Sequence, residues 1–227
     1  MKRLHLCLHL ESDATFGRGE GLAGLVDEEI EYDVAGLPFV RGRTLKGLLV
    51  EECANLLFAL QKAEAPALTR FEKAAARLFG CPGAGLEGAA LLHIGPALLP
   101  RELCKAVRFE IAAEALTPAD VLESLTTIRR QTAIDETRGA PEEGSLRSLR
   151  VVVRQTSFQA WLDFATDPAE DDLALLAACA LSVRRGGIGR NRGRGRLRLQ
   201  VLDEQGSDTI MQAHFEHFTQ LLRGEKS

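Results

Sequence analysis

The sequence predicts an α+β fold with a ferredoxin-like core, in which strands and helices follow in the order β-α-β-β-α-β. Residues 3–10 alternate leucines with polar side chains, which is the period of a strand that is covered on one face. A helical pattern, several strand patterns, a second helical pattern and a final strand follow in that order. A chain of 227 residues with 45% hydrophobic content can build one such core. We therefore expect a single domain over residues 1–227.

The first strand leads into a first large insertion, residues 11–42, which is rich in glycine and carboxylates. An alternating stretch around Ala35-Gly36 predicts an extended hairpin that projects from the core. Thr44 is then expected to cap a helix, with Lys46 and Gly47 in its first turn. A helix N-terminus attracts phosphate, and a glycine there allows close approach of the backbone.

The middle of the chain is expected to hold two helices, two strands and, between the strands, a short helical piece near Leu103. These are a helix over 68–79, a buried strand over 89–94, a strand over 108–112, and a helix capped by Thr117 that runs to about Arg129. His93, inside the buried strand, is expected to be a core histidine. Residues 131–148 show neither a helical nor a strand period and predict a second exposed insertion.

The last third of the chain is expected to complete the core. Strands over 149–155 and 157–164 are followed by a helix that opens at Asp167-Pro168 and ends at Arg184, then by a strand over 197–202 and an amphipathic C-terminal helix.

The stretch Arg184–Arg198, called the basic loop below, carries seven arginines, five glycines and no acidic residue. Its charge of +7 leaves −11 for the rest of the chain, because the total is −4. Glycine lets backbone N–H groups approach a ligand, and arginine presents planar cationic forks that match phosphate oxygens. The stretch therefore predicts a site for a polyanion, most simply a nucleic-acid backbone. His5 and His9, on the open face of the first strand, could also contact RNA.

The composition argues against several other kinds of site. The basic loop contains neither the dinucleotide fingerprint nor a P-loop, so mononucleotide binding is not favoured. Five scattered cysteines without a C-x-x-C pair disfavour a disulfide framework and a zinc cluster. The longest apolar runs are too short for a bilayer span, and the N-terminus lacks the apolar core of a signal peptide. We therefore expect a cytoplasmic protein that has no membrane contact.

Three motifs resemble those of a known family and occur in the same order. Residues 36–47, G-L-P-F-V-R-G-R-T-L-K-G, are similar to the L-P-x-I-P-G-S-S-L-K-G motif of CRISPR-associated RAMP superfamily proteins, with Arg41 in place of a proline. Residues 132–140, T-A-I-D-E-T-R-G-A, resemble the T-x-I-D-R-x-T stretch of that family, and the basic loop resembles its C-terminal glycine-rich loop. The resemblance covers nearly the whole chain and is closest to the Cas7 group, which forms the backbone of type III effector complexes.

The resemblance implies a modified RRM-like fold whose first hairpin is an extended thumb. It implies a subunit for antiviral defence that stacks with copies or relatives of itself, and with other Cas subunits, along a guide RNA (crRNA) that pairs with target RNA. The glycine-rich loop and the L-K-G helix start would hold the guide backbone. The RNA-binding candidates in this chain are Arg41, Arg43, Lys46, Gly47, Arg138, Arg184, Arg185, Gly186, Gly187, Gly189, Arg190, Arg192, Arg194 and Arg196.

The resemblance also implies a catalytic residue. In cleaving members, an aspartate ahead of the L-P motif cuts target RNA with a divalent metal, and the matching position here is Asp27. We therefore expect Asp27 to be both the catalytic residue and the metal ligand of an endonuclease that uses Mg²⁺ or Mn²⁺. Glu28, Glu29 and Asp33 are close in sequence and could assist from outside the ligand shell of the metal.

Two other interpretations remain open. The chain could be a purely structural subunit that binds guide RNA and neighbouring subunits without chemistry, because Arg41 replaces the proline of the motif and most of the chain is acidic. It could also be a guide-processing endonuclease of the Cas6 kind. That activity typically relies on a histidine near an early helix, and residues 44–63 contain none.

Overall fold

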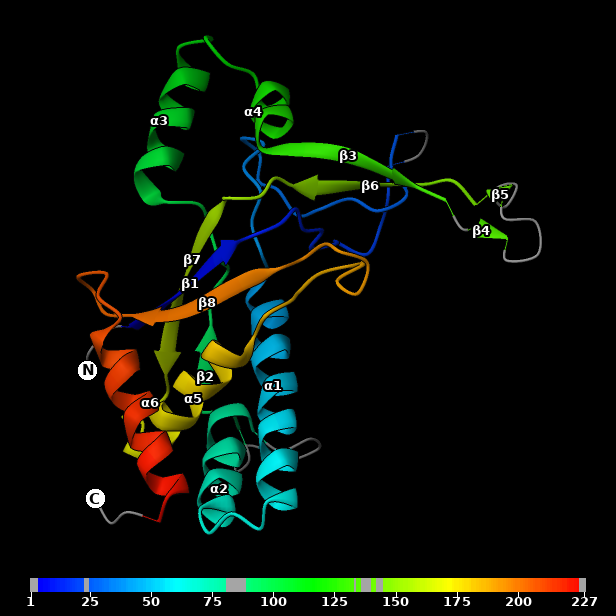
Figure 1. Cartoon of the computed structure of the whole chain (residues 1–227). Coiled ribbons are helices and arrows are strands. Elements are labelled where there is room, and N and C mark those ends of the chain that lie inside the picture. The colour runs from blue at the N-terminus through cyan, green and yellow to red at the C-terminus, as the bar shows by residue number, and fades with distance from the viewer. Residues whose placement is uncertain are drawn as a thin grey trace.

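The chain folds around a four-stranded antiparallel sheet whose strands are β2 (Leu92–Ile94), β7 (Ser157–Phe164), β1 (Leu4–Leu10) and β8 (Leu197–Leu202), in that spatial order (Figure 1). In chain order these are the second, third, first and fourth strands, which is the arrangement of a ferredoxin-like core. The computed structural model describes residues 4–22, 25–80, 89–132, 134–135, 140–141 and 145–224. The predicted α+β fold class is confirmed.

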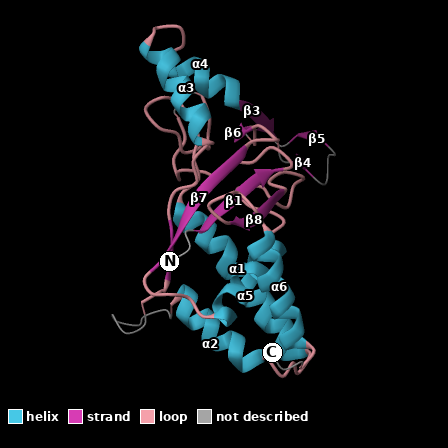
Figure 2. Ribbon diagram, turned by 90° about the vertical axis from the view of Figure 1, so that its left-hand side faces the viewer, coloured by secondary structure: helices cyan, strands magenta, loops and turns pink. Residues whose placement is uncertain are grey.

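Four helices gather on one face of this sheet (Figures 1 and 2). They are α1 (Gly42–Lys62), α2 (Leu68–Phe79), α5 (Glu170–Ser182) and α6 (Thr209–Leu222). α5 packs against the other three helices and against β8. It is therefore buried on almost every side, which its run of alanines and leucines allows. Across the bundle, Phe71 of α2 meets Phe218 of α6 with ring centroids 4.6 Å apart.

The leucines of β1 point into this bundle, as the alternation predicted. Leu6, Leu8 and Leu10 have no exposed surface, whereas Cys7 and His9 are partly exposed on the opposite face. β7 shows the same division, since Phe158 is fully buried and Trp161 is 55% exposed. One face of the sheet is thus covered by helices and the other, called the open face below, carries polar and aromatic side chains.

A second sheet forms where the second insertion was expected to be a loop. β3 (Thr126–Gln131) and β6 (Arg147–Val152) pair antiparallel, and the short β4 (Ile134–Asp135) and β5 (Ala140–Pro141) pair at their far end. This hairpin reaches outward from the body of the molecule (Figure 1). The prediction of an irregular loop over 131–148 is therefore wrong for the described residues at its two ends.

The first insertion folds along this hairpin. Its described residues contain isolated β-bridges such as Gly17 to Ile30 and Tyr32 to Pro38, and no regular strand. The N–H of Asp27 donates to the carbonyl of Ser148 at 2.8 Å, and further backbone hydrogen bonds follow along β6. The predicted turn at Ala35-Gly36 is confirmed, because Gly36 has a φ of +76° and its N–H donates to the carbonyl of Asp33.

A buried ion pair fixes the insertion to the hairpin. Glu29 has no exposed surface, and its carboxylate accepts from the guanidinium of Arg150 at 2.9 and 3.1 Å. Arg150 also donates to the hydroxyl of Thr126 at 3.2 Å, and Glu29 accepts from the N–H of Ile30. With its charges compensated and hydrogen bonded, the pair can stay out of water.

Two helices beyond the sheet differ from expectation. α3 (Arg101–Ala112) includes the stretch 108–112, which was wrongly predicted as a strand. Its partly buried residues Cys104, Val107 and Ile111 pack on the core at helical spacing, and that spacing outweighs the short alternation. α4 (Pro118–Leu125) begins at the predicted Thr117 capping box but ends four residues earlier than expected, because the β-branched residues after Leu125 pair with β6.

The start of α1 was also misplaced. The N-cap residue is Arg41 and not Thr44, so Lys46 lies beyond the first turn. A Cβ on Gly42 would collide with the backbone carbonyls of Ile94 and Gly95, so this close approach requires glycine.

The remaining elements agree with the sequence except in detail. α2, β8 and α6 form as predicted, and α5 ends at Ser182. β2 covers only 92–94, and His93 is exposed and not part of the core. Cys53 and Cys179 are buried as small apolar residues. Among the described helices, none has the length and apolar character that a membrane span needs.

Candidate nucleic-acid interface

The basic loop is held in a fixed shape by the first insertion. The N–H groups of Ile188 and Gly195 donate to the carbonyls of Thr15 and Asp13, at 2.8 and 2.9 Å. Gly187 has a φ of +86°, and a Cβ there would lie only 2.5 Å from the carbonyl oxygen of Thr15. The glycines therefore serve first to bring two backbone segments together, which leaves the arginine side chains outside.

The glycines differ in what they offer a ligand. Gly186 is buried against Leu48 and Leu197, and its N–H donates to the carbonyl of Gly195. Gly189 lies beside the guanidinium of Arg194, which a Cβ would approach to 3.0 Å. Because Gly186 is buried, its position does not favour direct contact with RNA. Gly187 and Gly189 are partly exposed, and their contact with RNA remains a prediction.

Most arginines of the basic loop lean on neighbouring polar groups. Arg190 donates two hydrogen bonds to the carboxylate of Glu51 on α1, at 2.7 and 2.8 Å. Arg194 donates to the amide oxygen of Gln131 at 2.6 Å, and Arg185 donates to the carbonyl of Arg190. Arg196 and Arg198 form ion pairs with Glu11, at 3.8 and 3.1 Å. The hydrogen bonds from Arg190 lower the pKa of Glu51 and raise that of Arg190. These contacts are at least partly exposed, so a phosphate can compete for the same donors.

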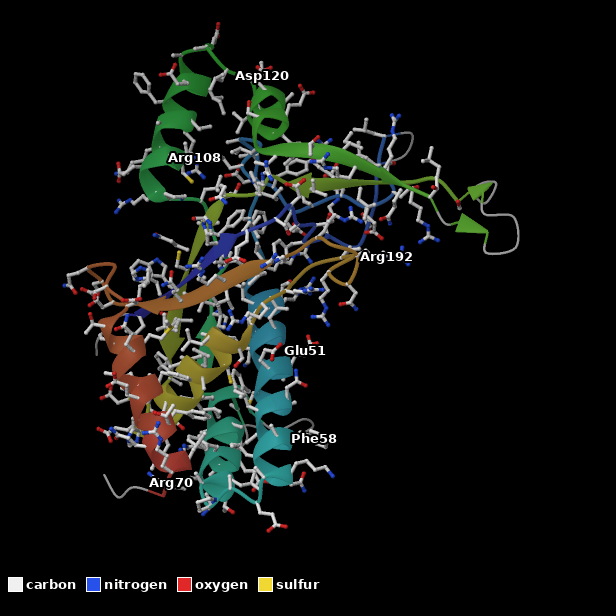
Figure 3. The ribbon with its side chains drawn as sticks, in the orientation of Figure 1. Glu51, Phe58, Arg70, Arg108, Asp120 and Arg192 are labelled. Atoms are coloured by element: carbon white, nitrogen blue, oxygen red, sulfur yellow. The ribbon has the colours of Figure 1, made fainter. Side chains whose placement is uncertain are left out.

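Two arginines remain available. Arg184 and Arg192 are exposed, and within the described part of the chain neither has an ion pair or a side-chain hydrogen bond. Arg192 lies at the tip of the basic loop, above Glu51 on α1 (Figure 3). Arg184 lines a hollow of about 380 Å³ with Arg185, Arg196, Arg198 and Glu11. Four guanidinium groups and one carboxylate make this hollow suited to a phosphate group.

The predicted residues of α1 lie partly beside the basic loop. Gly47 is exposed, and it lies one turn before Glu51, which holds Arg190, so its surface faces the same side of the helix. Arg43 is exposed one turn earlier. Lys46 points elsewhere, since its ammonium group donates to the carbonyl of Leu92 at 3.2 Å and burial lowers its pKa.

The last two candidates are Arg41 and Arg138. Arg41 forms an ion pair with Glu31 of the first insertion. Arg138 lies outside the described residues.

Asp27 lies on the first insertion beside β6 and not in the basic loop. Its carboxylate accepts from the N–H of Ser148 at 2.6 Å and from the hydroxyl of Ser148 at 3.1 Å. These hydrogen bonds, the backbone one first, lower the pKa of Asp27, so the group is ionised at neutral pH. A hollow of about 650 Å³ opens next to it, with Leu25, Leu146 and Arg130 in its lining.

Two acidic neighbours of Asp27 in sequence, Glu29 and Asp33, are held by other partners. Glu29 is occupied by Arg150, and the two carboxylate oxygens of Asp33 accept from the turn at residues 35–37 and from Arg108. Among the described residues, no three metal-binding side chains gather into a cluster. A single ionised carboxylate in an open hollow fits a hydrated Mg²⁺ ion, which keeps most of its waters.

Two residues at this place were missed by sequence reasoning. Ser148, at the end of the second insertion, orients Asp27 across 121 positions of the chain. Arg130 of β3 is exposed and shares the hollow with Asp27. The only sequence signal for Arg130 is its place next to a second arginine, Arg129. No local pattern in the sequence indicates that either arginine lies beside the first insertion.

Comparison with known proteins relates most of the chain to one family. The model of the RAMP superfamily matches residues 8–198. A chain in the cryo-EM structure of type III-B Cmr-beta bound to cognate target RNA has a TM-score of 0.63 at 15% identity, covering 88% of this chain and 97% of that one. A chain of apo type III-B Cmr-beta gives 0.59 at 15% identity, with 89% and 98% covered.

A chain of a type IV-B CRISPR complex is also similar. It gives a TM-score of 0.56 at 14% identity, and the similarity covers 88% of this chain and 90% of that one. Among curated proteins, no sequence matches. At these identities the solved structures establish a shared fold.

Proposed function

The chain belongs to the RAMP superfamily, and from this premise we propose that it is a Cas7-like backbone subunit of a type III CRISPR effector complex that holds guide RNA along its basic loop. The observation that carries this proposal is the geometry of that loop. Its backbone is fixed by Thr15 and Asp13, while Arg184, Arg192 and the arginine-lined hollow face outward. A rigid frame with outward guanidinium groups favours a chain of phosphates over a single small anion.

The partners follow from the same premise. The similar chains are parts of a type III-B complex with cognate target RNA and of a type IV-B CRISPR complex. This supports guide RNA, target RNA and other Cas subunits, including copies or relatives of this chain, as its partners in the cytoplasm. Base pairing would read the target sequence while the protein holds the backbone.

We also propose that Asp27 takes part in metal-dependent cleavage of target RNA. Its carboxylate is ionised, is oriented by Ser148 and borders an open hollow large enough for a ribose-phosphate group. Asp27 would hold Mg²⁺ or Mn²⁺, and the ion would supply stabilisation of negative charge at the phosphate.

The residues around Asp27 would position the RNA. The 2′-OH of the target would lose its proton to solvent water and attack the adjacent phosphorus in line, so that a bond forms from O2′ to phosphorus. The bond from phosphorus to O5′ would break and O5′ would take a proton from water, which leaves a 2′,3′-cyclic phosphate and a free 5′-OH. Arg130 is placed to hold the phosphate in the same hollow, and Ser148 keeps the carboxylate of Asp27 in one orientation.

A purely structural role for Asp27 is the second candidate, and one contact favours it. The insertion and β6 are joined by reciprocal bonds between Asp27 and Ser148, in which the Asp27 N–H donates to the Ser148 carbonyl and the Asp27 side chain accepts in return. Such a bridge would be useful without any chemistry, because it fixes the outer part of the insertion.

The assembled complex tests the two candidates. Wild type, Asp27→Ala and the control Asp163→Ala, which removes an exposed aspartate of β7, are incubated with a matched labelled RNA with and without EDTA. Cleavage predicts regularly spaced products with wild type and the control that disappear with EDTA and in Asp27→Ala. Unchanged cutting by Asp27→Ala would leave this residue with the structural role alone.

A further inference from the structure

The open face of the central sheet carries three rows of outward side chains, of which the first begins with Arg198, the last residue of the basic loop. The register of β8, β1 and β7 sets the rows as Arg198–His9–Ser157, Gln200–Cys7–Gln159 and Leu202–His5–Trp161. The first row adjoins the basic loop and the third is at the far end of the sheet. The face therefore runs from a cation, through two amides, to an aromatic pair.

The aromatic pair is the unusual feature of this face. Trp161 is the single tryptophan of the chain and is 55% exposed, although indoles are usually buried for most of their area. Its ring meets that of His5 edge to face, with centroids 5.7 Å apart at 66°. The contact is edge to face, and more than half of the Trp161 surface stays exposed.

A hollow of about 610 Å³ lies beside this pair, between the sheet and α3. His5 lines the hollow, is only 9% exposed, and its Nδ1 is buried with no hydrogen-bond partner. A buried polar atom without a partner costs stability unless a ligand or water satisfies it. Gln159 adds an exposed amide to the same wall.

Cations outnumber acids around the hollow. Arg101, Lys105 and Arg108 reach it from α3, where Figure 3 labels Arg108, and Glu204 is the acid that lines it. Lys105 pairs with the exposed Glu102 and Arg108 with the partly exposed Asp33, so a phosphate can compete for both cations. The net positive charge of the lining thus complements a ligand that combines an aromatic ring with an anionic group.

We propose that this hollow binds an unstacked nucleobase of single-stranded RNA, with the base stacked on the exposed surface of Trp161 and its polar edge hydrogen bonded to His5 and Gln159. The phosphate next to that base lies toward Arg101 and Lys105. The proposal rests on the RNA-binding function proposed above and adds a second, separate contact surface to it. Single-stranded RNA is recognised in this way because its bases are free to stack on aromatic side chains and to present their edges.

A protein partner fits this surface less well. A protein interface needs a contiguous apolar centre, whereas the exposed apolar side chains that line this hollow are Trp161 and Leu98, set among amides, a histidine and cations. Leu103 and Phe109 are also exposed, but they belong to α3 and do not line the hollow.

The single tryptophan makes the test direct. The full chain is titrated with a ten-nucleotide oligouridine and, separately, with an abasic ribose-phosphate chain of the same length, and the indole fluorescence is recorded. We expect saturable quenching by the oligouridine and none by the abasic chain. Binding of a labelled oligouridine, measured by anisotropy, should weaken about 5- to 100-fold in Trp161→Ala, less in Trp161→Phe, and not in the control Phe109→Ala.

The other outcomes separate this proposal from the one it rests on. If Arg192→Ala weakens RNA binding while Trp161→Ala does not, the basic loop keeps its function and the base-binding hollow is wrong. If no variant and not even wild type binds RNA, both proposals fail. Equal quenching by the abasic chain, or a change in oligomeric state of Trp161→Ala without a change in RNA affinity, also overturns base binding. Circular dichroism of each variant confirms that it folds.

Discussion

At the scale of single residues, the position of Asp27 makes a prediction about acid. Hydrogen bonds from Ser148 hold the pKa of Asp27 below its ordinary value of 3.8. A carboxyl whose pKa is lower in the folded than in the unfolded state stabilises the fold above the unfolded pKa, and that contribution is lost as pH falls through the folded pKa. We expect Asp27→Asn to be less stable than wild type at neutral pH and equally stable in strong acid.

Chemical denaturation from pH 7 down to about pH 2 measures this difference. Glu123→Gln, an exposed acid of α4, is the control and should track wild type throughout. If Asp27→Asn is less stable than wild type by the same amount at pH 7 and at about pH 2, the hydrogen bonds from Ser148 do not stabilise the ionised carboxylate of Asp27.

Arg192 provides a second prediction at this scale, because it is exposed and unpaired among the described residues. Each phosphate contact with single-stranded nucleic acid contributes about 0.7 to the slope of log affinity against log salt. We expect Arg192→Ala to weaken RNA binding and to reduce the slope by about that amount. Anisotropy at several salt concentrations measures it, with Arg70→Ala of α2 as the arginine control. An unchanged slope would remove Arg192 from the interface.

At the scale of elements, the glycines of the basic loop can be separated by substitution. A Cβ on Gly187 would press on the carbonyl of Thr15, whereas a Cβ on Gly193 meets nothing within 4 Å, and both residues have positive φ. We expect Gly187→Ala to cost about 2 kcal/mol of unfolding free energy and to weaken RNA binding. Gly193→Ala, the matched control, should cost about 1 kcal/mol from its backbone conformation alone. Equal losses in the two variants would show that the close approach to Thr15 contributes nothing.

The pair between Glu29 and Arg150 predicts how the first insertion is attached to the hairpin. Glu29→Gln leaves the guanidinium of Arg150 buried without a counter-charge, so we expect a loss of about 3 kcal/mol in denaturant unfolding. Replacing both residues by Leu and Met should recover most of that loss, because no charge then remains buried. Breaking the exposed pair of Lys105 and Glu102 should cost less than about 0.5 kcal/mol. A double variant whose unfolding free energy is lower than that of Glu29→Gln would contradict this explanation.

Local patterns predicted most of the elements, and longer contacts explain the failures. α2 and β8 were predictable because helical spacing and alternation lie within each segment. The stretch 108–112 also alternates, but it belongs to α3 because Cys104 and Val107 upstream continue a helical stripe. β3 was missed because its strand form depends on pairing with β6, which is distant in sequence.

At the scale of the whole molecule, the sequence predicts the order of the core strands and helices and the position of the basic loop. It does not predict which distant segments these elements contact. Arginine and glycine composition alone marks the basic loop. Its contact with α1 joins Arg190 to Glu51 across 139 positions, and the hollow beside Asp27 needs both insertions, so neither could be derived from a local pattern. The open face is a further example. The alternation of the first strand predicts that His5 points away from the helices, but only the pairing register with β7 places Trp161 beside it.

If the basic loop holds the guide RNA, removing its exposed arginines should lower the RNA content of the assembled complex. One complex carries Arg184→Ala, Arg185→Ala and Arg192→Ala together, and its control carries Arg70→Ala, Lys73→Ala and Arg223→Ala, which remove the same charge from exposed positions of the helical side. We expect the first complex to lose its guide RNA during purification at moderate salt, while the control keeps it. Equal amounts of guide RNA in both complexes would contradict the account.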